Sequence, residues 1–268
     1  MKVEHIFEKG VGKINEDAYF INGKQFGVFD GATSLDTSVY ENGSTGGFLA
    51  SAIAKNTFSK NGASLKTLAG MANGEIRRKM LEKGINLTDK KNLWSTSAAV
   101  IRVENNIVEW VQTGDCLILA ILKDGSHKIL TDHNNHDLET LRMWNTLKGT
   151  TDESIHAALK PQIIKVRAQM NVSYGALSGE DEALDFINHG SMPLAEIRHL
   201  IIFSDGLFIP SKEPEQKTDF KLFCDLFQEG GLNAIRDYVR DIEATDVDCK
   251  KYPRFKQHDD IAAVSLSF

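Results

Sequence analysis

The chain has 268 residues, of which 41% are hydrophobic and 25% charged, and its formal net charge is −6. This length supports a large buried core, and the acidic balance excludes a general nucleic-acid surface, which needs an excess of basic residues on one face. No apolar run approaches the roughly 18 residues that span a membrane, and the start lacks the regions of a signal peptide. We therefore expect one cytoplasmic domain, residues 1–268, with neither nucleic acid nor membrane as a partner, and the oligomeric state stays open.

The first predicted elements are two short strands, at residues 18–21 and 25–29, joined by an Asn-Gly pair that is a strong hairpin signal. The second strand delivers Asp30 into a glycine turn, where a carboxylate has no hydrophobic reason to be and the glycine permits close backbone approach. The hairpin would place Asp17 and Asp30 at the same end of a sheet.

Helices and a run of strands follow. A polar loop over residues 33–47 leads into a helix that begins near Ser44 or Thr45, and Ser64 has the residue type of an N-cap for a second helix, which Gly84 can close. A layer of helices on an antiparallel meander is then indicated. The strands of this meander are predicted at residues 96–103, 107–112, 117–122 and 127–130.

The middle of the chain is more polar. His133 and His136 lie in a polar loop after the meander, and we interpret them as solvated side chains and not as metal ligands. Helices are predicted at residues 136–147 and 152–166. Residues 169–198 contain several glycines and no sustained period, so they are predicted to be irregular.

The last third repeats the pattern of the first hairpin. An apolar run at residues 199–203 leads into Asp205, which is again followed by a glycine. Two helices are predicted at residues 219–228 and 232–242, broken by a Gly-Gly pair. After a polar connection, Asp259 opens the final strand, so that three strand ends offer carboxylates to one oxygen-rich site.

Each of these acids also has a simpler interpretation. Asp-Gly is a common turn dipeptide, and Asp124 illustrates it in a hairpin turn between two apolar strands, with no need of a metal. The combination is more informative than any single acid. Five motifs stand in order along the chain: Asn15-Glu16-Asp17, Asp30-Gly31, Gly114-Asp115, Ser204-Asp205-Gly206, and Asp259-Asp260 before a terminal strand.

This series resembles, from end to end, the motifs of the metal-dependent serine/threonine protein phosphatases, the protein phosphatase 2C family, in its bacterial type. The strand and helix pattern predicts an α+β fold with two antiparallel sheets face to face, flanked by helices. The resemblance implies that these form a four-layer α/β/β/α sandwich. It also implies a variable flap near the catalytic face, which would correspond to the irregular residues 169–198, with substrate contacts at residues 174–185.

The resemblance implies a site for two Mn²⁺ or Mg²⁺ ions. Asp30 would bridge both ions, the carbonyl of Gly31 would bind one of them, and Asp205 and Asp259 would complete the other. Carboxylates, a backbone carbonyl and waters are hard ligands, which suit magnesium or manganese and not zinc or copper.

Three further acids have roles implied by the resemblance. Asp17, with Glu16 nearby, would act through metal-bound waters, and Asp115 would hold a weaker third ion. Two ions roughly 3.5 to 4 Å apart can lower the pKa of a bridging water and orient the hydroxide for in-line attack on phosphorus. No protein nucleophile is then needed, and the three cysteines are interpreted as free thiols.

Two departures from the family stand out. Its most familiar members place a histidine, a proposed general acid, directly after the Asp-Gly pair, where this chain has Ala32. They also carry a phosphate-binding arginine at the position of Gly12. Lys13 beside it could hold phosphate as a point charge, without the bidentate fork of arginine, or it could be a solvated loop residue.

The expected function is metal-dependent hydrolysis of phosphoserine and phosphothreonine in proteins, with a phosphorylated protein as the partner. One alternative is a pseudophosphatase that acts as a binding module, although Asp17, Asp30, Asp115, Asp205 and Asp259 all survive. Another is a phosphatase that acts on a small phosphorylated metabolite. The sequence does not name the physiological substrate or distinguish magnesium from manganese.

Overall fold

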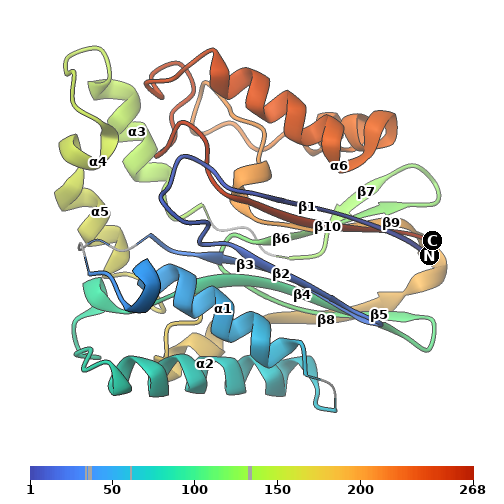
Figure 1. Cartoon of the computed structure of the whole chain (residues 1–268). Coiled ribbons are helices and arrows are strands. Elements are labelled where there is room, and N and C mark those ends of the chain that lie inside the picture. Colours follow the sequence, from blue (N-terminus) through green and yellow to red (C-terminus); the bar gives the residue numbers. More distant parts are fainter. Residues whose placement is uncertain (34, 36–37, 61, 132–134) are drawn as a thin grey trace.

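Two five-stranded antiparallel sheets face each other in the computed structural model (Figure 1), which describes the chain except for residues 34, 36–37, 61 and 132–134. The first sheet has the strand order β1-β10-β9-β6-β7, with bounds Lys2–Glu8, Ile261–Ser267, Ile197–Phe203, Leu117–Leu122 and His127–Ile129. The second has the order β2-β3-β4-β5-β8, with bounds Ala18–Asn22, Gln25–Gly31, Thr96–Glu104, Ile107–Thr113 and Asn188–Pro193.

Helices cover the outer face of each sheet. Helices α1 (Gly46–Phe58) and α2 (Leu65–Glu82) pack on the second sheet, and α6 (Phe220–Ala244) packs on the first (Figure 1). One apolar cluster lies under each helical layer, and a third fills the space between the sheets. Burial of apolar side chains on both faces of each sheet therefore explains the four-layer α/β/β/α arrangement, as predicted.

Local signals begin and end the helices where the sequence indicates. Thr45 Oγ1 accepts a hydrogen bond from the N–H of Phe48 at 3.2 Å, and Ser64 Oγ accepts one from the N–H of Thr67 at 3.1 Å. The predicted break in the last helix is also present, since Gly231 has a φ of +69° inside α6.

Shorter helices lie at one end of the sandwich, beside the rim that carries the acids (Figure 1). They are α3 (Leu138–Leu147), α4 (Ile155–Ala158) and α5 (Lys160–Arg167). The sequence predicted one helix over residues 152–166, but Leu159 has a φ of −115° and ψ of 20°, and Pro161 follows in the first turn of α5. Proline is accepted at a helix start and disfavours helical geometry in the preceding residues, so two short helices form.

Two strands were not predicted. Strand β1 pairs along its whole length with β10, and β8 pairs with β5, although residues 188–193 were expected to be irregular. The side chains of β8 alternate between partly buried and exposed, which is typical of an edge strand. Gly190 allows this pairing because a Cβ there would lie 2.4 Å from the Trp110 ring. Pro193 ends the strand, where no further ladder bond is required.

The topology brings distant parts of the chain to one rim. In antiparallel sheets, the starts of β2, β6 and β10 lie beside the ends of β3, β5 and β9. The two chain termini lie at the opposite end (Figure 1). Among the described residues, no helix has the combination of length and apolar composition needed to cross a membrane.

Candidate active site

Acids from both sheets meet at this rim. Asp30 is near the end of β3 in the second sheet, and Asp205 directly follows Ser204 after β9 in the first sheet. Electrostatic interactions with one another raise the pKa values of several of these carboxyl groups. The members of this acid cluster are Asp17, Asp30, Asp115, Asp205 and Asp259.

Asp30 and Asp205 form the centre of the cluster. Burial raises the pKa of Asp30 well above its ordinary value, and the carboxylates of neighbouring acids raise it further. Burial likewise raises the pKa of Asp205, followed by the charge of Asp30. The two carboxyl groups lie side by side, and neighbouring carboxylates disfavour each other's charged form. Two acids that would both be charged in water are therefore held together at this rim.

Asp17 lies beneath this pair, with only 4% of its surface exposed. Its Oδ2 accepts a hydrogen bond from Ser204 Oγ at 2.7 Å, and Ser204 Oγ in turn accepts from the N–H of Ala262 at 2.9 Å. Burial raises the pKa of Asp17, while the Ser204 bond opposes the increase and the charge of Asp259 adds to it. The hydroxyl thus joins an acid of the first loop to strands of the other sheet.

Asp115 is held at the same rim by the strand next to Asp30. Its Oδ1 accepts a hydrogen bond from Ser97 Oγ at 2.6 Å, and Ser97 is the cross-strand partner of Asp30. Gly114 permits this approach, because its φ is +74° and a Cβ would lie 2.2 Å from Ser97 Oγ. The turn between β5 and β6 therefore positions Asp115 beside Asp30.

Gly31 has the close approach that the sequence indicated. A Cβ at this position would lie 2.4 Å from the carbonyl oxygen of Gly47 and 2.5 Å from that of Glu16. No larger residue fits between those two backbone segments without displacing one of them. Gly31 lines the cavity described below, so its backbone is available at the site.

Glu16 is engaged differently from the five aspartates. Its Oε2 accepts a hydrogen bond from Thr33 at 2.7 Å, and its Oε1 accepts one from Thr45. These contacts connect the first loop to the segment before α1. Asp260 is a residue whose role sequence reasoning missed: its carboxylate accepts from the N–H groups of Gly10 at 2.7 Å and Glu16 at 2.8 Å. The position of Asp260 next to Asp259 in the sequence could have indicated that it lies at the same rim.

A cavity of about 490 Å³ opens over the acids. Asp30, Asp115, Asp205 and Asp259 lie along it, and the opposite wall comes from α4 and α5. That wall is mixed: Ala157, Ile163, Ile164 and Val166 are apolar, and Ser154, His156, Lys160 and Arg167 are polar or basic.

Less of the expected flap reaches the cavity than the sequence suggested. Of residues 174–185, Tyr174, Gly175 and Ala176 line it. The next residues are held against α2, where Asn73 Oδ1 accepts hydrogen bonds from the N–H groups of Ser178 and Gly179. The helices α4 and α5 therefore provide the wall that the family resemblance had placed later in the chain.

Lysine and arginine side chains at the cavity come from two places. Lys256, before β10, places its Nζ 2.7 Å from Asp259 Oδ1, whereas Lys160 and Arg167 lie on α5. Burial lowers the pKa of Lys256, but the charges of Asp259, Asp30 and Asp205 outweigh it, so the net direction is upward. Lys13 is exposed and does not line this cavity.

The histidines also differ from a simple solvated loop. His136 lines the cavity and stacks on Tyr174, with ring centroids 4.0 Å apart and an interplanar angle of 6°. Its Nε2 lies 3.6 Å from Asp137 Oδ2. His133 lies outside the described residues.

The donor set fits a hard divalent cation in its chemistry. The cluster offers carboxylate oxygens, the backbone of Gly31 lies beside them, and mutual repulsion of buried carboxyl groups is the condition that a cation relieves. Among the described residues, however, no three acid, histidine or cysteine side chains already surround a common point in the manner of ligands. The Lys256–Asp259 ion pair engages an oxygen that an ion could use.

Comparisons with solved structures support this fold. Stp1, a serine/threonine phosphatase from Staphylococcus aureus, has a TM-score of 0.61 at 16% identity, covering 100% of this chain and 94% of its own. PppA from Pseudomonas aeruginosa has a TM-score of 0.61 at 16% identity, covering 100% and 97%. The catalytic domain of the phosphatase PstP in complex with two manganese ions has a TM-score of 0.57 at 15% identity, covering 98% and 96%.

The sequence comparison is more specific. No match to a curated protein was found. The model of the family Protein phosphatase 2C, in contrast, matches residues 8–238, which include four of the five motifs and most of both sheets. The family predicted from the order of the motifs is thereby confirmed, and the chain belongs to the protein phosphatase 2C family.

Proposed function

We propose that this protein hydrolyses phosphoserine and phosphothreonine esters in proteins, in a reaction that depends on bound divalent metal ions. The observation that carries the proposal is the convergence of acids from both sheets, with Asp30 and Asp205 side by side and partly buried. Buried like charges cost free energy unless a cation or a proton neutralises them. Bound metal ions would neutralise these carboxylates and would also take part in the reaction.

The ligands would be those of the acid cluster. Asp30 would lie between the two ions, with the Gly31 carbonyl on one side and Asp205 and Asp259 on the other. Asp17 and Glu16 would act through waters, and Asp115 is proposed for a third ion. The metal ions, when bound, would polarise the phosphoryl group and make a water nucleophilic near neutral pH. Magnesium and manganese both suit these oxygen donors.

Cys116 and Ser204 are poorly suited to act as covalent nucleophiles at this rim. Burial raises the pKa of Cys116, and the nearby carboxylates raise it further, so its thiol stays protonated. Ser204 Oγ already donates to Asp17 and accepts from the N–H of Ala262. Both side chains are thereby held in structural roles, which supports direct attack by water.

The shape of the cavity supports a protein substrate. The acids lie on one side, and apolar side chains of α5, including Ile163, Ile164 and Val166, lie on the other. A phosphorylated side chain can reach the acids while its neighbouring residues contact these apolar side chains. A small phosphorylated metabolite would leave these side chains exposed to water, which gives it less favourable contact.

The test compares substrates under controlled metal conditions. Phosphate release would be measured from phosphothreonine and phosphoserine peptides and from a panel of small phosphate esters, with Mn²⁺ and then with chelator. We expect the peptides to be preferred and release to stop with chelator. Preference for a small ester would redirect the substrate class, and absence of release with any metal would favour a pseudophosphatase.

A further inference from the structure

A phosphate monoester dianion faces an electrostatic difficulty at this rim. It must approach several carboxyl groups, and the family position that carries a phosphate-binding arginine is Gly12 here. Lys13, the neighbouring cation, is exposed and does not line the cavity. A cation from elsewhere in the chain would therefore serve the phosphate better.

Lys256 has the position for this role. It lines both the large cavity and an adjoining one of about 200 Å³, and its side chain is 23% exposed, so Nζ is partly shielded yet reachable. The charges of Asp30 and Asp205 act on it as well as that of Asp259. By contrast, Lys160 is exposed on α5, and Arg167 donates to the carbonyl of Thr33 at 3.1 Å.

The contact with Asp259 places this ammonium directly beside a proposed metal ligand. Oδ1 of Asp259 accepts from Lys256 Nζ at 2.7 Å and from the N–H of Asp260 at 2.9 Å. Within the described part of the chain, Oδ2 of Asp259 takes part in no such hydrogen bond. One carboxylate can therefore face a cation on each side, which places Lys256 next to any ion that Oδ2 holds.

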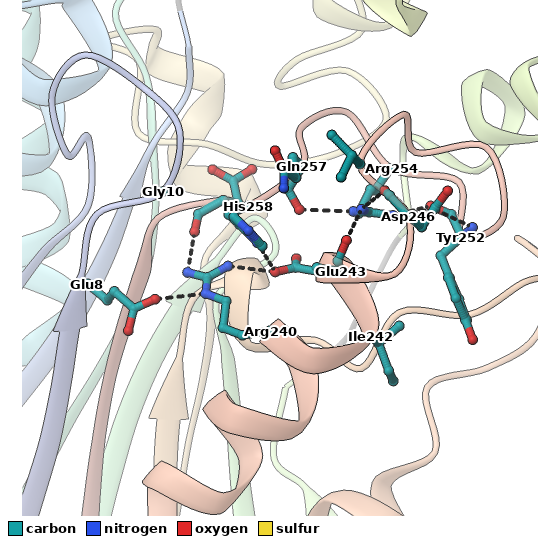
Figure 2. Close-up of polar contacts among 12 residues, drawn as sticks. Glu8, Gly10, Arg240, Ile242, Glu243, Asp246, Tyr252, Arg254, Gln257 and His258 are labelled. Carbon is teal, nitrogen blue, oxygen red and sulfur yellow. Dashed lines mark hydrogen bonds and ion pairs between the residues drawn. The ribbon is translucent and has the colours of Figure 1, made fainter.

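The loop that carries Lys256 is firmly anchored (Figure 2). Asp246 Oδ1 accepts from the N–H groups of Lys250 and Lys251, and its Oδ2 accepts from the N–H of Tyr252 and from Arg254 Nη1 at 2.7 Å. This arrangement fixes the backbone of residues 250–252 and the side chain of Arg254, which lies two residues before Lys256. Fewer conformations are then lost when the ammonium binds a ligand.

A second set of contacts fixes the other side of Lys256. Arg240 donates to the carbonyl of Asp259 and to the carboxylates of Glu8 and Glu243, each at 2.8 Å. Glu243 also lies 2.8 Å from His258 Nδ1, as Figure 2 shows. The segment from Arg254 to Asp259 is thus held at both ends, with Lys256 between them.

We propose that Lys256 is the phosphate-binding cation of this site, and that it takes the place of the arginine found elsewhere in the family. The inference rests on the proposed function, because the ligand is the phosphate of the substrate. Lys256 would contact a phosphate oxygen while it remains close to Asp259. Its charge interacts with the phosphate in the ground state and in the transition state alike.

The experiment measures binding of inorganic phosphate, so it does not require turnover. Calorimetry would titrate phosphate into the Mg²⁺-loaded full chain and into three variants: Lys256→Met, which removes the charge, Lys256→Arg, which retains it, and Lys251→Met. Lys251 is an exposed lysine of the same loop, so this last variant gives a matched change in net charge. Circular dichroism would confirm folding, and Mg²⁺ affinity would be measured separately without phosphate.

We expect Lys256→Met to weaken phosphate binding about tenfold or more, because a hydrogen bond to a charged group is lost. The phosphate affinity of Lys256→Arg should stay within about threefold of that of the parent. The phosphate affinity of Lys251→Met should equal that of the parent. With a phosphopeptide, Lys256→Met should raise KM more than it lowers kcat.

The proposal is overturned if Lys256→Met binds phosphate like the parent at saturating Mg²⁺, even if its metal affinity changes, because Lys256 would then only position Asp259. It is also overturned if the parent binds no phosphate. If Lys256→Met does not fold, the two remaining variants decide. The proposal is contradicted if Lys256→Arg and Lys251→Met are both folded and lose phosphate binding to the same extent. Phosphate binding through Lys256 without release from any phosphopeptide would refute the proposed function and leave this inference standing.

Discussion

The carboxyl group of Asp30 in one sheet lies beside that of Asp205 in the other. The two acids bring the end of strand β3 next to the end of β9, and their withdrawal from water raises both pKa values. A folded protein holds two such groups together only at a cost in free energy. We infer that this pair of acids destabilises the metal-free fold and is retained because metal-dependent catalysis requires it.

Removal of one charge from the Asp30–Asp205 pair should abolish turnover but stabilise the metal-free fold. Asp30→Asn and Asp205→Asn should each abolish turnover and weaken Mn²⁺ binding in calorimetry. Without metal, each should raise the free energy of unfolding, because burial and the neighbouring carboxylates disfavour the charged form of the acid that is removed. Asp124→Asn, in the exposed hairpin turn, is the control and should change neither property. Variants that bound two ions like the parent would contradict these ligand assignments.

The metal-free protein should lose stability as pH rises. Burial raises the folded-state pKa of Asp17, Asp30 and Asp205 above the ordinary value of 3.8, so the folded state binds more protons than the unfolded state above that pH. Stability from these groups is therefore complete below about pH 3.8 and is lost as pH rises through the folded pKa values. Urea unfolding with chelator should give a lower free energy at pH 8 than at pH 5.5.

Two comparisons control this pH experiment. Asp246 has a lowered pKa, but its opposing contribution is complete above its ordinary value of 3.8, outside the chosen range. Burial lowers the pKa of His156 and His199, so these two histidines oppose the predicted decrease within the range and are replaced by glutamine in a control variant. Saturating Mn²⁺ should remove most of the decrease, and Asp30→Asn should reduce it. A metal-free protein whose stability rose from pH 5.5 to pH 8 would show that these acids are not the dominant titrating groups.

Asp115 should affect turnover more than assembly of the site. Asp115→Ala should leave the fold and the central ions in place but lower kcat, by no more than the roughly 10²–10⁴-fold credited to a general acid. Ser97→Ala, which removes the hydrogen bond to Asp115 Oδ1, should have the same direction of effect and a smaller size. The measurement is kcat across Mn²⁺ concentrations. Unchanged kcat and metal dependence in Asp115→Ala would make Asp115 a turn residue only.

Much of the fold could be predicted because its signals are local. The caps at Thr45 and Ser64 and the Gly231 break depend on residues next to them in sequence, and each occurs as predicted. Strand β8 could not be predicted in the same way. Its glycine and proline indicate an irregular segment, and it becomes a strand only because β5 offers an edge to pair with.

The sequence predicts the acids of the candidate site but not the contacts that support them. Asp30 and Asp205 stand out because a carboxylate follows a buried strand, whereas Lys256 lies in a polar connection with charges of both signs and no period. Its role depends on Arg240, Asp246 and other residues that only the tertiary fold brings near. The contacts of Glu16 with two threonines are equally non-local.

The anchored loop before β10 should be important for stability. Asp246→Asn removes the buried ion pair with Arg254 and weakens the bonds from three backbone N–H groups, so unfolding in urea should cost about 3 kcal/mol less. Asp248→Asn, an exposed acid in the same loop, is the matched control and should stay within about 0.5 kcal/mol of the parent. Equal, small effects of both would mean that the loop is held by other contacts.

The most direct test of the whole account is phosphate release from a phosphothreonine peptide by the full chain. The account predicts release with Mn²⁺, its loss with chelator, and its return when excess Mn²⁺ is restored. The Asp30→Asn variant should show none under the same conditions. Release that continued in chelator, or a complete absence of release with either Mn²⁺ or Mg²⁺, would contradict the claim that the acids of the two sheets form a metal-dependent phosphatase site.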